Sequence, residues 1–367
     1  GNKIFINTGL IINHPDPDIL RGIIAHEIGH ILGRHVVRNQ EIIENYQKAS
    51  IGATALGLVA AMSGSADAGM AVVLGGSHFA RRSIYAYSRT FESSADQTAI
   101  RLLEKSSHSV IGLIKFFEQV RKLQATGIDN PYESTHPLSN DRVTILKSFN
   151  KRSKFQLSQN HDDIVHKYQR SSAKLAAFTL EIDNIFKHSY VTQTKDITTY
   201  MNAIKSFRMG SFDDSLNYIN QLIIKHPDDP YYHELKGQLY FEAGKGDALV
   251  EYKIAIETRP DDELILLGKA IVGITKHIDR PGYLEQFHKD LERVLQKNPD
   301  SVLALHYNAI YYNKMGMVGE GYLSAALIAL KSGRIADARK MASAAKNALA
   351  KKSVDWYRAG DILAATE

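Results

Sequence analysis

The sequence predicts a mostly α-helical protein in two parts, an N-terminal helical domain with a small strand element and a C-terminal stack of repeated helix pairs. Its 367 residues suit two domains of ordinary size. Apolar residues recur at helical spacing within residues 1–150. After about residue 200, proline-aspartate motifs recur at similar intervals, which is typical of an α-solenoid.

The composition limits the classes of function that the chain can have. Hydrophobic residues make up 44% and charged residues 23%, the balance of a folded protein with sizeable cores. The formal net charge is +5 without a dense run of Lys and Arg, so we expect no nucleic-acid partner. This charge is compatible with peripheral contact to anionic lipid headgroups. The sequence contains no Cys, which excludes disulfides, thiolate metal ligands and a cysteine nucleophile.

The N-terminal residues predict a strand, a turn and then a long helix. Residues 3–8 carry β-forming side chains before Gly9, which indicates a strand and turn. Residues 15–18, Pro-Asp-Pro-Asp, predict a turn and a helix start. The apolar residues that follow recur at helical spacing: Ile19, Ile23, Ile24, Ile28, Ile31 and Leu32. Because the chain begins with Gly1, we expect a fragment or processed form, with any targeting segment upstream.

The most specific chemical pattern lies on this helix, in Ala25-His26-Glu27-Ile28-Gly29-His30. A separation of four residues places both imidazoles on one helix face, where they can bind a single ion. Neutral imidazole suits Zn²⁺, and a catalytic zinc site has three protein ligands and one position for water. Glu27 directly follows His26 and can act as the general base for that water. Gly29 allows another backbone to approach closely. The pattern predicts a zinc peptidase.

A third ligand has to come from elsewhere in the chain. Residues 91–100 predict a second helix, on which Glu92 and Asp96 lie four apart on one face. Glu92 is a candidate oxygen ligand, and Asp96 could accept the second ring N–H of a ligand histidine. The residues alone leave open the alternative of two acidic side chains on a solvated face. His35 would lie about 140° around the helix from His30, so we interpret it as a surface or packing residue. The same interpretation applies to three further histidines: His78, His161 and His166.

Residues 49–80 form a segment rich in small and apolar side chains. Its apolar runs are shorter than the roughly 20 residues that span a membrane as a helix. We interpret the segment as a pair of tightly packed or re-entrant helices that cover the active site. Membrane contact is the alternative interpretation.

The C-terminal half of the chain carries an internal repeat. Ala248 and Ala255 stand twelve and five residues before Pro260, as in tetratricopeptide repeats. The recurring motifs are separated by 33 and 39 residues: Pro227-Asp-Asp, Pro260-Asp-Asp and Pro299-Asp-Ser.

These repeats define the expected domain organisation. We expect four helix pairs over residues 196–350, the third with an insertion near Pro281, and a C-terminal tail over residues 351–367. Residues 151–195 are more polar, and we expect a helical connector with one amphipathic helix from Ala173 to Phe186.

Four segments resemble, in their order and spacing, the M48 family of zinc peptidases. They are Asn7-Thr8-Gly9-Leu10, Ile24 to His35, Ser88-Arg89-x-x-Glu92-x-x-x-Asp96, and Ser134-Thr135-His136-Pro137 with Arg142. The resemblance covers residues 1–150 and implies a gluzincin-like peptidase domain with one Zn²⁺ held by His26, His30 and Glu92. Together with the repeats, the chain resembles periplasmic members of the family that act in outer-membrane protein quality control in Gram-negative bacteria.

The resemblance also implies the surroundings in which the enzyme works. Its substrates would be misfolded or misassembled envelope proteins, in the periplasm, with membrane association left open. The repeats would recruit substrate or dock the outer-membrane assembly machinery. The family's upstream Asn-Ala-Phe-Ala segment, which helps to form the substrate-binding edge, is not in this chain, so we expect an N-terminal truncation.

The resemblance also implies roles for His136 and Arg142, and each residue has an alternative role. In repeat-bearing members of the family, the histidine at the position of His136 can occupy the fourth metal position and hold the enzyme latent, since a fourth nitrogen ligand displaces the water. Alternatively, His136 caps a helix at Pro137. Arg142 could stabilise the oxyanion of the reaction or pair with Glu92 or Asp96. A rival function also stays open, a latent chaperone-like binding protein whose zinc site is closed and structural.

Overall fold

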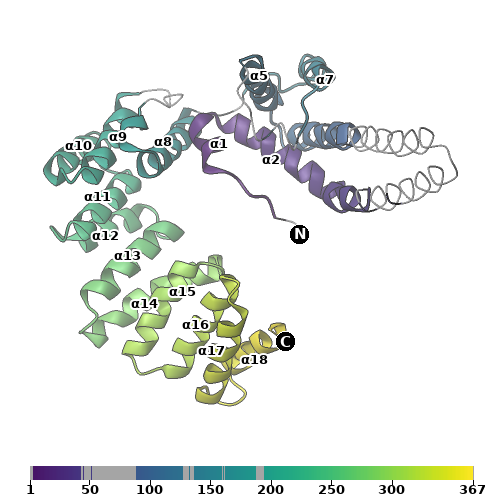
Figure 1. Cartoon of the computed structure of the whole chain (residues 1–367). Coiled ribbons are helices and arrows are strands. Elements are labelled where there is room, and N and C mark those ends of the chain that lie inside the picture. Colours follow the sequence, from purple (N-terminus) through teal and green to yellow (C-terminus); the bar gives the residue numbers. More distant parts are fainter. Residues whose placement is uncertain are drawn as a thin grey trace, which may run out of the picture. The chain divides into compact units, whose positions relative to one another are not determined.

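Figure 1 shows the computed structural model of the chain. The residues that the structure describes are 3–42, 44, 51, 88–126, 132, 136–158, 160, 162–186 and 194–366. The helix pair expected over residues 49–80 lies outside them, apart from Ile51. The chain divides into two compact units, Gly1–Ile197 and Thr198–Glu367. The mostly α-helical fold is confirmed in both units. In the described part of the chain, no helix is long and apolar enough to cross a membrane.

The strand expected at residues 3–8 is wrong. Residues 3–7 have no regular structure, and helix α1 occupies Thr8–Asn13. The Asn7 side chain accepts a hydrogen bond from the backbone N–H of Gly9 at 2.8 Å and so caps this helix. The β-forming side chain of Phe5 is 89% exposed, so burial does not favour a strand there. Local capping outweighs the β-propensity of these residues.

Helix α2, Pro17–Leu32, begins as the sequence predicts. Asp16 accepts a hydrogen bond from the backbone N–H of Asp18, and Pro17 stands at the first helical position. The helix packs against α5, Ile111–Ala125, and the two lie side by side in Figure 1. The core that they share includes Ile19, Ile23, Leu113, Phe117 and, from helix α7 (Asn140–Asn150), Val143 and Leu146. This core fixes the face of α2 that carries the paired histidines.

The connector forms a longer and earlier helix than expected. Helix α8 spans Asp162–Thr179 instead of residues 173–186, and a short 3₁₀ turn, η1, follows at Ile182–Asn184. Its two leading aspartates favour a helix start at this point because they complement the helix dipole. Helix α8 packs on α1 and α2, where the Ser172 hydroxyl donates to the carbonyl of Ile11 at 2.8 Å.

Residues 194–366 are described without a gap and fold into ten successive helices. Their bounds are α9 Lys195–Arg208, α10 Phe212–Lys225, α11 Pro230–Glu242, α12 Ala248–Thr258, α13 Glu263–Lys276, α14 Pro281–Lys297, α15 Val302–Lys314, α16 Val318–Lys331, α17 Ile335–Ala348 and α18 Val354–Ala365. From α10 onward each helix packs on the next, and α11 and α13 also pack on the second helix along. This pattern of near-neighbour contacts is typical of an α-solenoid.

Two details of the expected repeat region differ in the structure. The insertion near Pro281 lengthens α14, which at 17 residues begins with that proline. The segment expected as a tail contains α18, which packs on α16 and α17 through buried Ala359 and Ile362. The helices therefore continue beyond the four pairs that we expected. The sequence did not predict α18 because no proline-aspartate motif precedes it.

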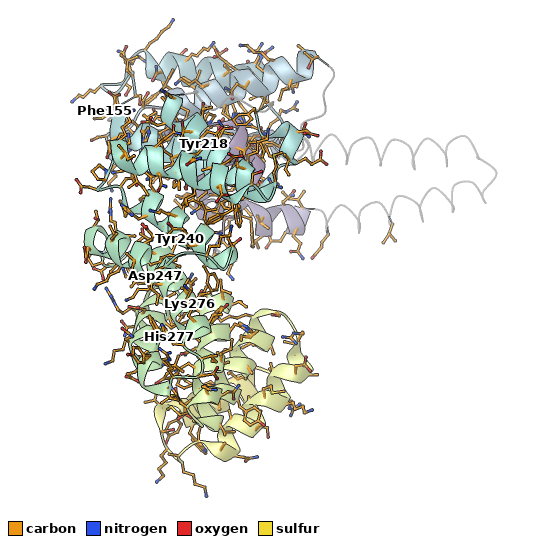
Figure 2. The ribbon with its side chains drawn as sticks, turned by 90° about the vertical axis from the view of Figure 1, so that its left-hand side faces the viewer. Phe155, Tyr218, Tyr240, Asp247, Lys276 and His277 are labelled. Atoms are coloured by element: carbon orange, nitrogen blue, oxygen red, sulfur yellow. The ribbon has the colours of Figure 1, made fainter. Side chains whose placement is uncertain are left out.

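The repeated proline-aspartate motifs act as helix starts. The third residue of each motif is the N-cap of the following helix: Asp229 before α11, Asp262 before α13 and Ser301 before α15. Each side chain accepts a backbone N–H of the first turn, at 3.0 to 3.3 Å. Figure 2 labels a further cap, Asp247 at the start of α12. Helix α11 ends at Glu242, and Gly244, directly after the C-cap residue Ala243, has a φ of +64°, which favours glycine.

Small residues let large aromatic side chains pack between the repeat helices. The Tyr252 ring on α12 lies between Gly237 on α11 and Gly268 on α13. A Cβ atom would come within 2.9 Å of this ring at Gly237 and within 2.6 Å of it at Gly268. A larger residue at either position would therefore push the helices apart.

Candidate metal centre

Two helices supply the candidate ligands, and Gly29 brings them together. A Cβ atom at Gly29 would lie 2.7 Å from the carbonyl oxygen of Ala95 and 2.8 Å from its Cα. Helix α2 therefore contacts the helix over residues 88–105 backbone to backbone. The prediction that Gly29 permits a close approach is confirmed. It places Glu92 opposite His26 and His30.

The ligand atoms of these three side chains converge. His26 Nε2 lies 3.1 Å from His30 Nε2. Each of these nitrogens lies 3.3 Å from an oxygen of the Glu92 carboxylate. Zinc bonds of about 2.0–2.1 Å in a tetrahedral arrangement separate ligand atoms by about 3.3 Å. The donor types and their spacing fit a single divalent ion.

His136 joins these three residues. Among the described residues, His26, His30, Glu92 and His136 form a group whose ligand atoms all lie within 4.8 Å of one another. His136 Nδ1 is 3.2 Å from Glu92 Oε1, and its Nε2 is 3.7 Å from Glu27 Oε1. The ring stacks on Tyr132 at a centroid distance of 4.6 Å.

His136 is not the N-cap of helix α7, the helix that follows Pro137. Helix α7 starts at Asn140, and its N-cap is Ser139, which accepts the backbone N–H of Arg142. His136 lies before that start and turns its ring toward the histidine pair, with ring centroids 5.5 Å from His26 and 5.1 Å from His30.

Arg142 pairs with both acidic residues of the site. Its Nε and Nη2 donate to the two oxygens of Asp96 at 2.7 and 2.9 Å. Its Nη1 lies 2.9 Å from Glu92 Oε2 and donates to the carbonyl of Pro137 at 3.0 Å. The guanidinium also lies over the Phe117 ring at 4.6 Å. Of the two roles considered for Arg142, this geometry supports pairing.

These charges keep both carboxylates ionised. Burial opposes the charge of Glu92, but hydrogen bonds from the three imidazoles and the charge of Arg142 hold its pKa well below the ordinary value. Burial also opposes the charge of Asp96, and its contacts with Arg142 and His26 lower its pKa. A carboxylate must be ionised to bind a metal ion, so the network prepares Glu92 for that role.

Asp96 contacts the ring nitrogen of His26 that faces away from the cluster. The Asp96 Oδ1 atom lies 2.9 Å from His26 Nδ1. A carboxylate at this position holds the proton on Nδ1 and leaves Nε2 free for an ion. This is the geometry expected of Asp96 from the sequence.

Sequence reasoning missed His35. The ring is buried, at 3% exposure, and its Nδ1 lies 3.0 Å from His30 Nδ1. Burial and the neighbouring charges of His30 and Arg38 lower the pKa of His35 to about 4. The prediction that His35 points away from His30 assumed a continuous helix. However, α2 ends at Leu32 and Arg34 adopts a positive φ of 53°. Gly33 was the available signal, since a glycine after an apolar periodic run commonly ends a helix.

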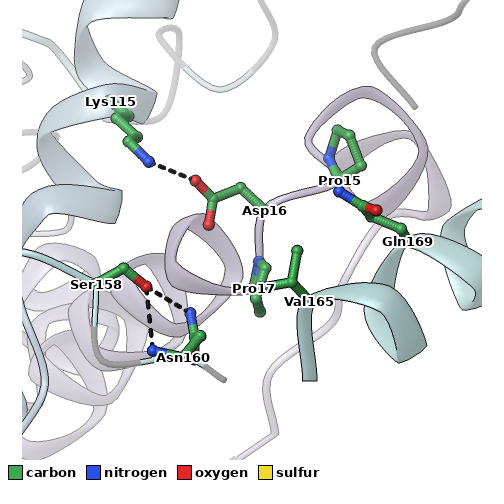
Figure 3. Close-up of a pocket in the computed structure, with 8 residues that line it drawn as sticks. All are labelled: Pro15, Asp16, Pro17, Lys115, Ser158, Asn160, Val165 and Gln169. Atoms are coloured by element: carbon green, nitrogen blue, oxygen red, sulfur yellow. Dashed lines mark hydrogen bonds and ion pairs between the residues drawn. The ribbon is translucent and has the colours of Figure 1, made fainter. Parts of the chain in front are cut away.

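Of the other histidines considered, only His166 is among the described residues, and it is not part of the cluster. His78 and His161 lie outside the described residues, and His166 lies on α8. A separate cavity of about 360 Å³ lies by Pro15 and Pro17. Figure 3 shows its lining, in which Lys115 contacts Asp16 at 2.7 Å. None of its lining residues belongs to the histidine cluster.

Comparison with known proteins agrees with this geometry. Residues 1–150 match the family model of peptidase family M48. The match covers the first 150 of the 367 residues. The peptidases of this family are metal-dependent.

Curated relatives extend the similarity into the second unit. The chain is 22% identical over 272 residues to the beta-barrel assembly-enhancing protease of Yersinia pestis. It is 22% identical over 280 residues to the protein of the same name from Escherichia coli strain K12. Each alignment covers 72% of this chain and 55% of the relative. The chain thus spans about half the length of the curated relatives that it matches.

Proposed function

We propose that the protein is a zinc-dependent endopeptidase with His26, His30 and Glu92 as metal ligands and Glu27 as general base. The observation that carries the proposal is the 3.1–3.3 Å spacing of two imidazole nitrogens and a buried carboxylate. When bound, Zn²⁺ would polarise the scissile carbonyl and acidify water at the site. A match to a metal-dependent peptidase family supports the same chemistry.

The chain's own residues account for the proton transfers. The Glu27 side chain is 26% exposed, so water can reach it, and it follows the ligand His26 on the same helix. It would take a proton from the attacking water and deliver it to the leaving amine. Arg142 and Asp96 hold the ligands in place from the buried side of the site.

We extend the proposal to the substrate and the second unit. The relatives' name, beta-barrel assembly-enhancing protease, supports a role in envelope protein quality control, with misfolded or misassembled proteins as substrates in the periplasm. The motifs and helix pattern of the second unit support tetratricopeptide repeats, which bind extended chains or partner proteins on a concave face. They would recruit substrate or dock the outer-membrane assembly machinery.

Metal removal tests the core of the proposal. We expect the purified chain to contain about one zinc ion and to digest casein. A strong chelator should abolish digestion, and added Zn²⁺ should restore it. Elemental analysis and a fluorescent casein assay measure the two effects. A chain without metal, or digestion that persists in the chelator, would contradict a zinc peptidase.

The position of His136 supports a second candidate, a latent binding protein with a closed four-ligand site. Replacing His136 with Ala should raise casein digestion if this imidazole blocks the water position. The exposed His306 on α15 offers the matched control, since His306→Ala leaves the site intact. Unchanged or reduced digestion in His136→Ala would count against a blocking role. If the chain also binds zinc but digests no casein in any variant, the binding function is favoured.

A further inference from the structure

We propose that His35 is a positioning residue that orients His30 as a metal ligand. The inference rests on the proposed zinc site and concerns a residue that its ligand set does not include. His30 presents Nε2 to His26 and Glu92. Its other ring nitrogen, Nδ1, lies 3.0 Å from His35 Nδ1.

The hydrogen bond fixes which nitrogen of each ring carries a proton. An imidazole that offers its Nε2 lone pair to a metal carries its proton on Nδ1. His30 therefore donates from Nδ1, and His35 must accept with the Nδ1 lone pair. The proton of His35 then lies on Nε2. The Nδ1 atoms of the two paired histidines thus contact different groups, Asp96 in the case of His26 and His35 in the case of His30.

The local chain conformation places the His35 ring in a narrow slot. Helix α2 ends at Leu32, and Arg34 adopts a positive φ of 53° before the chain becomes helical again at His35. One face of the His35 ring stacks on Phe91, at a centroid distance of 4.6 Å and an interplanar angle of 14°. Against Gly33 there is no spare room, because a Cβ atom at that position would lie 2.1 Å from His35 Nε2.

This slot connects both helices of the site. Phe91 directly precedes the candidate ligand Glu92, while Gly33 and Arg34 follow the helix that carries His30. A ring held between the two helices cannot rotate away from His30 without moving one of them. Such outer contacts to a ligand histidine are typically worth 10- to 100-fold in metal affinity.

Two substitutions at position 35 separate hydrogen bonding from packing. His35→Phe keeps a ring between Gly33 and Phe91 but has no acceptor. His35→Asn loses the ring but can place its amide oxygen near the position of Nδ1. Zinc affinity of the full chain is measured by competition with a chromophoric chelator, and the visible spectrum of the Co²⁺-substituted chain reports the ligand geometry. His288→Phe is the matched control, a buried histidine stacked on Tyr311 in the second unit.

We expect His35→Phe to bind zinc about 10- to 100-fold more weakly, with His35→Asn near wild type and the control unchanged. Equal affinity in wild type and His35→Phe would overturn the inference, as would equal losses in both position-35 variants. If His35→Phe fails to fold, Gly33→Ala decides, because its methyl group displaces the His35 ring at an ordinary φ of −74°. Unchanged affinity there overturns the inference. A wild-type chain that binds no zinc would instead refute the proposed function itself.

Discussion

Replacing Glu27 with Gln is expected to lower casein digestion by about 100- to 10,000-fold while the metal stays bound. The glutamine amide has nearly the same shape as the carboxylate but cannot accept the proton of the attacking water. Glu27 is outside the proposed ligand set, and its carboxylate oxygen is 3.7 Å from His136 Nε2. Removing its charge should therefore leave the ligand positions unchanged.

The measurement for Glu27 pairs initial rates of casein digestion with elemental analysis of the same samples. Glu41→Gln is a matched control, since Glu41 is exposed on the helical residues that follow the site. If Glu27→Gln digests casein at the wild-type rate, the assignment of Glu27 as general base is wrong. Loss of metal together with activity would instead place Glu27 among the ligands, which the proposal does not allow.

The histidine pair was the part of the site that sequence alone could predict well. A separation of four residues on an amphipathic helix fixes the relative direction of His26 and His30. Their relation to Glu92 depends on a tertiary contact, the approach of the Gly29 and Ala95 backbones. Spacing along the chain does not encode such a contact. Without the resemblance, the sequence could not distinguish a metal ligand at Glu92 from an acidic side chain on a solvated helix face.

His35 and the strand at residues 3–8 were mispredicted for a shared reason. In both places a local turn or cap outweighed the pattern on which the prediction depended. Asn7 caps a helix where β-propensity indicated a strand. Arg34, with its positive φ, interrupts the helix where helical periodicity placed His35 on the far side. Positive φ at a residue other than glycine is uncommon, and the sequence carries no strong sign of it.

In the repeat region, the sequence predicted the helix starts that carry a capping side chain in a proline-aspartate motif. Asp229, Asp262 and Ser301 mark helix starts in the sequence and in the structure. The starts of α16 and α17 have no side-chain cap, and α18 uses Ser353 without a preceding proline-aspartate pair. Packing of small residues such as Ala342 and Ala359 stabilises this end instead, and packing is less visible in one sequence than capping.

Replacing Arg142 with Leu is expected to destabilise the first unit by about 3–5 kcal/mol, because it leaves two buried carboxylates without their cation. Arg142 is 5% exposed and contacts both Glu92 and Asp96. For a unit of this size, the loss corresponds to a decrease of roughly 10 °C in melting temperature. Thermal unfolding of the metal-free chain measures it, since bound metal would add its own stabilisation.

The Arg142 prediction also separates pairing from oxyanion stabilisation. Arg101→Leu, an exposed arginine on the same helical run as Glu92, should change the melting temperature little. Adding Asp96→Leu to Arg142→Leu should recover part of the lost stability, because one of the unpaired charges is then removed as well. If Arg142→Leu leaves stability intact and lowers only kcat, the guanidinium acts on the reaction and the pairing role is wrong. A fall in stability that the second substitution partly reverses requires Arg142 to hold the carboxylates of the site.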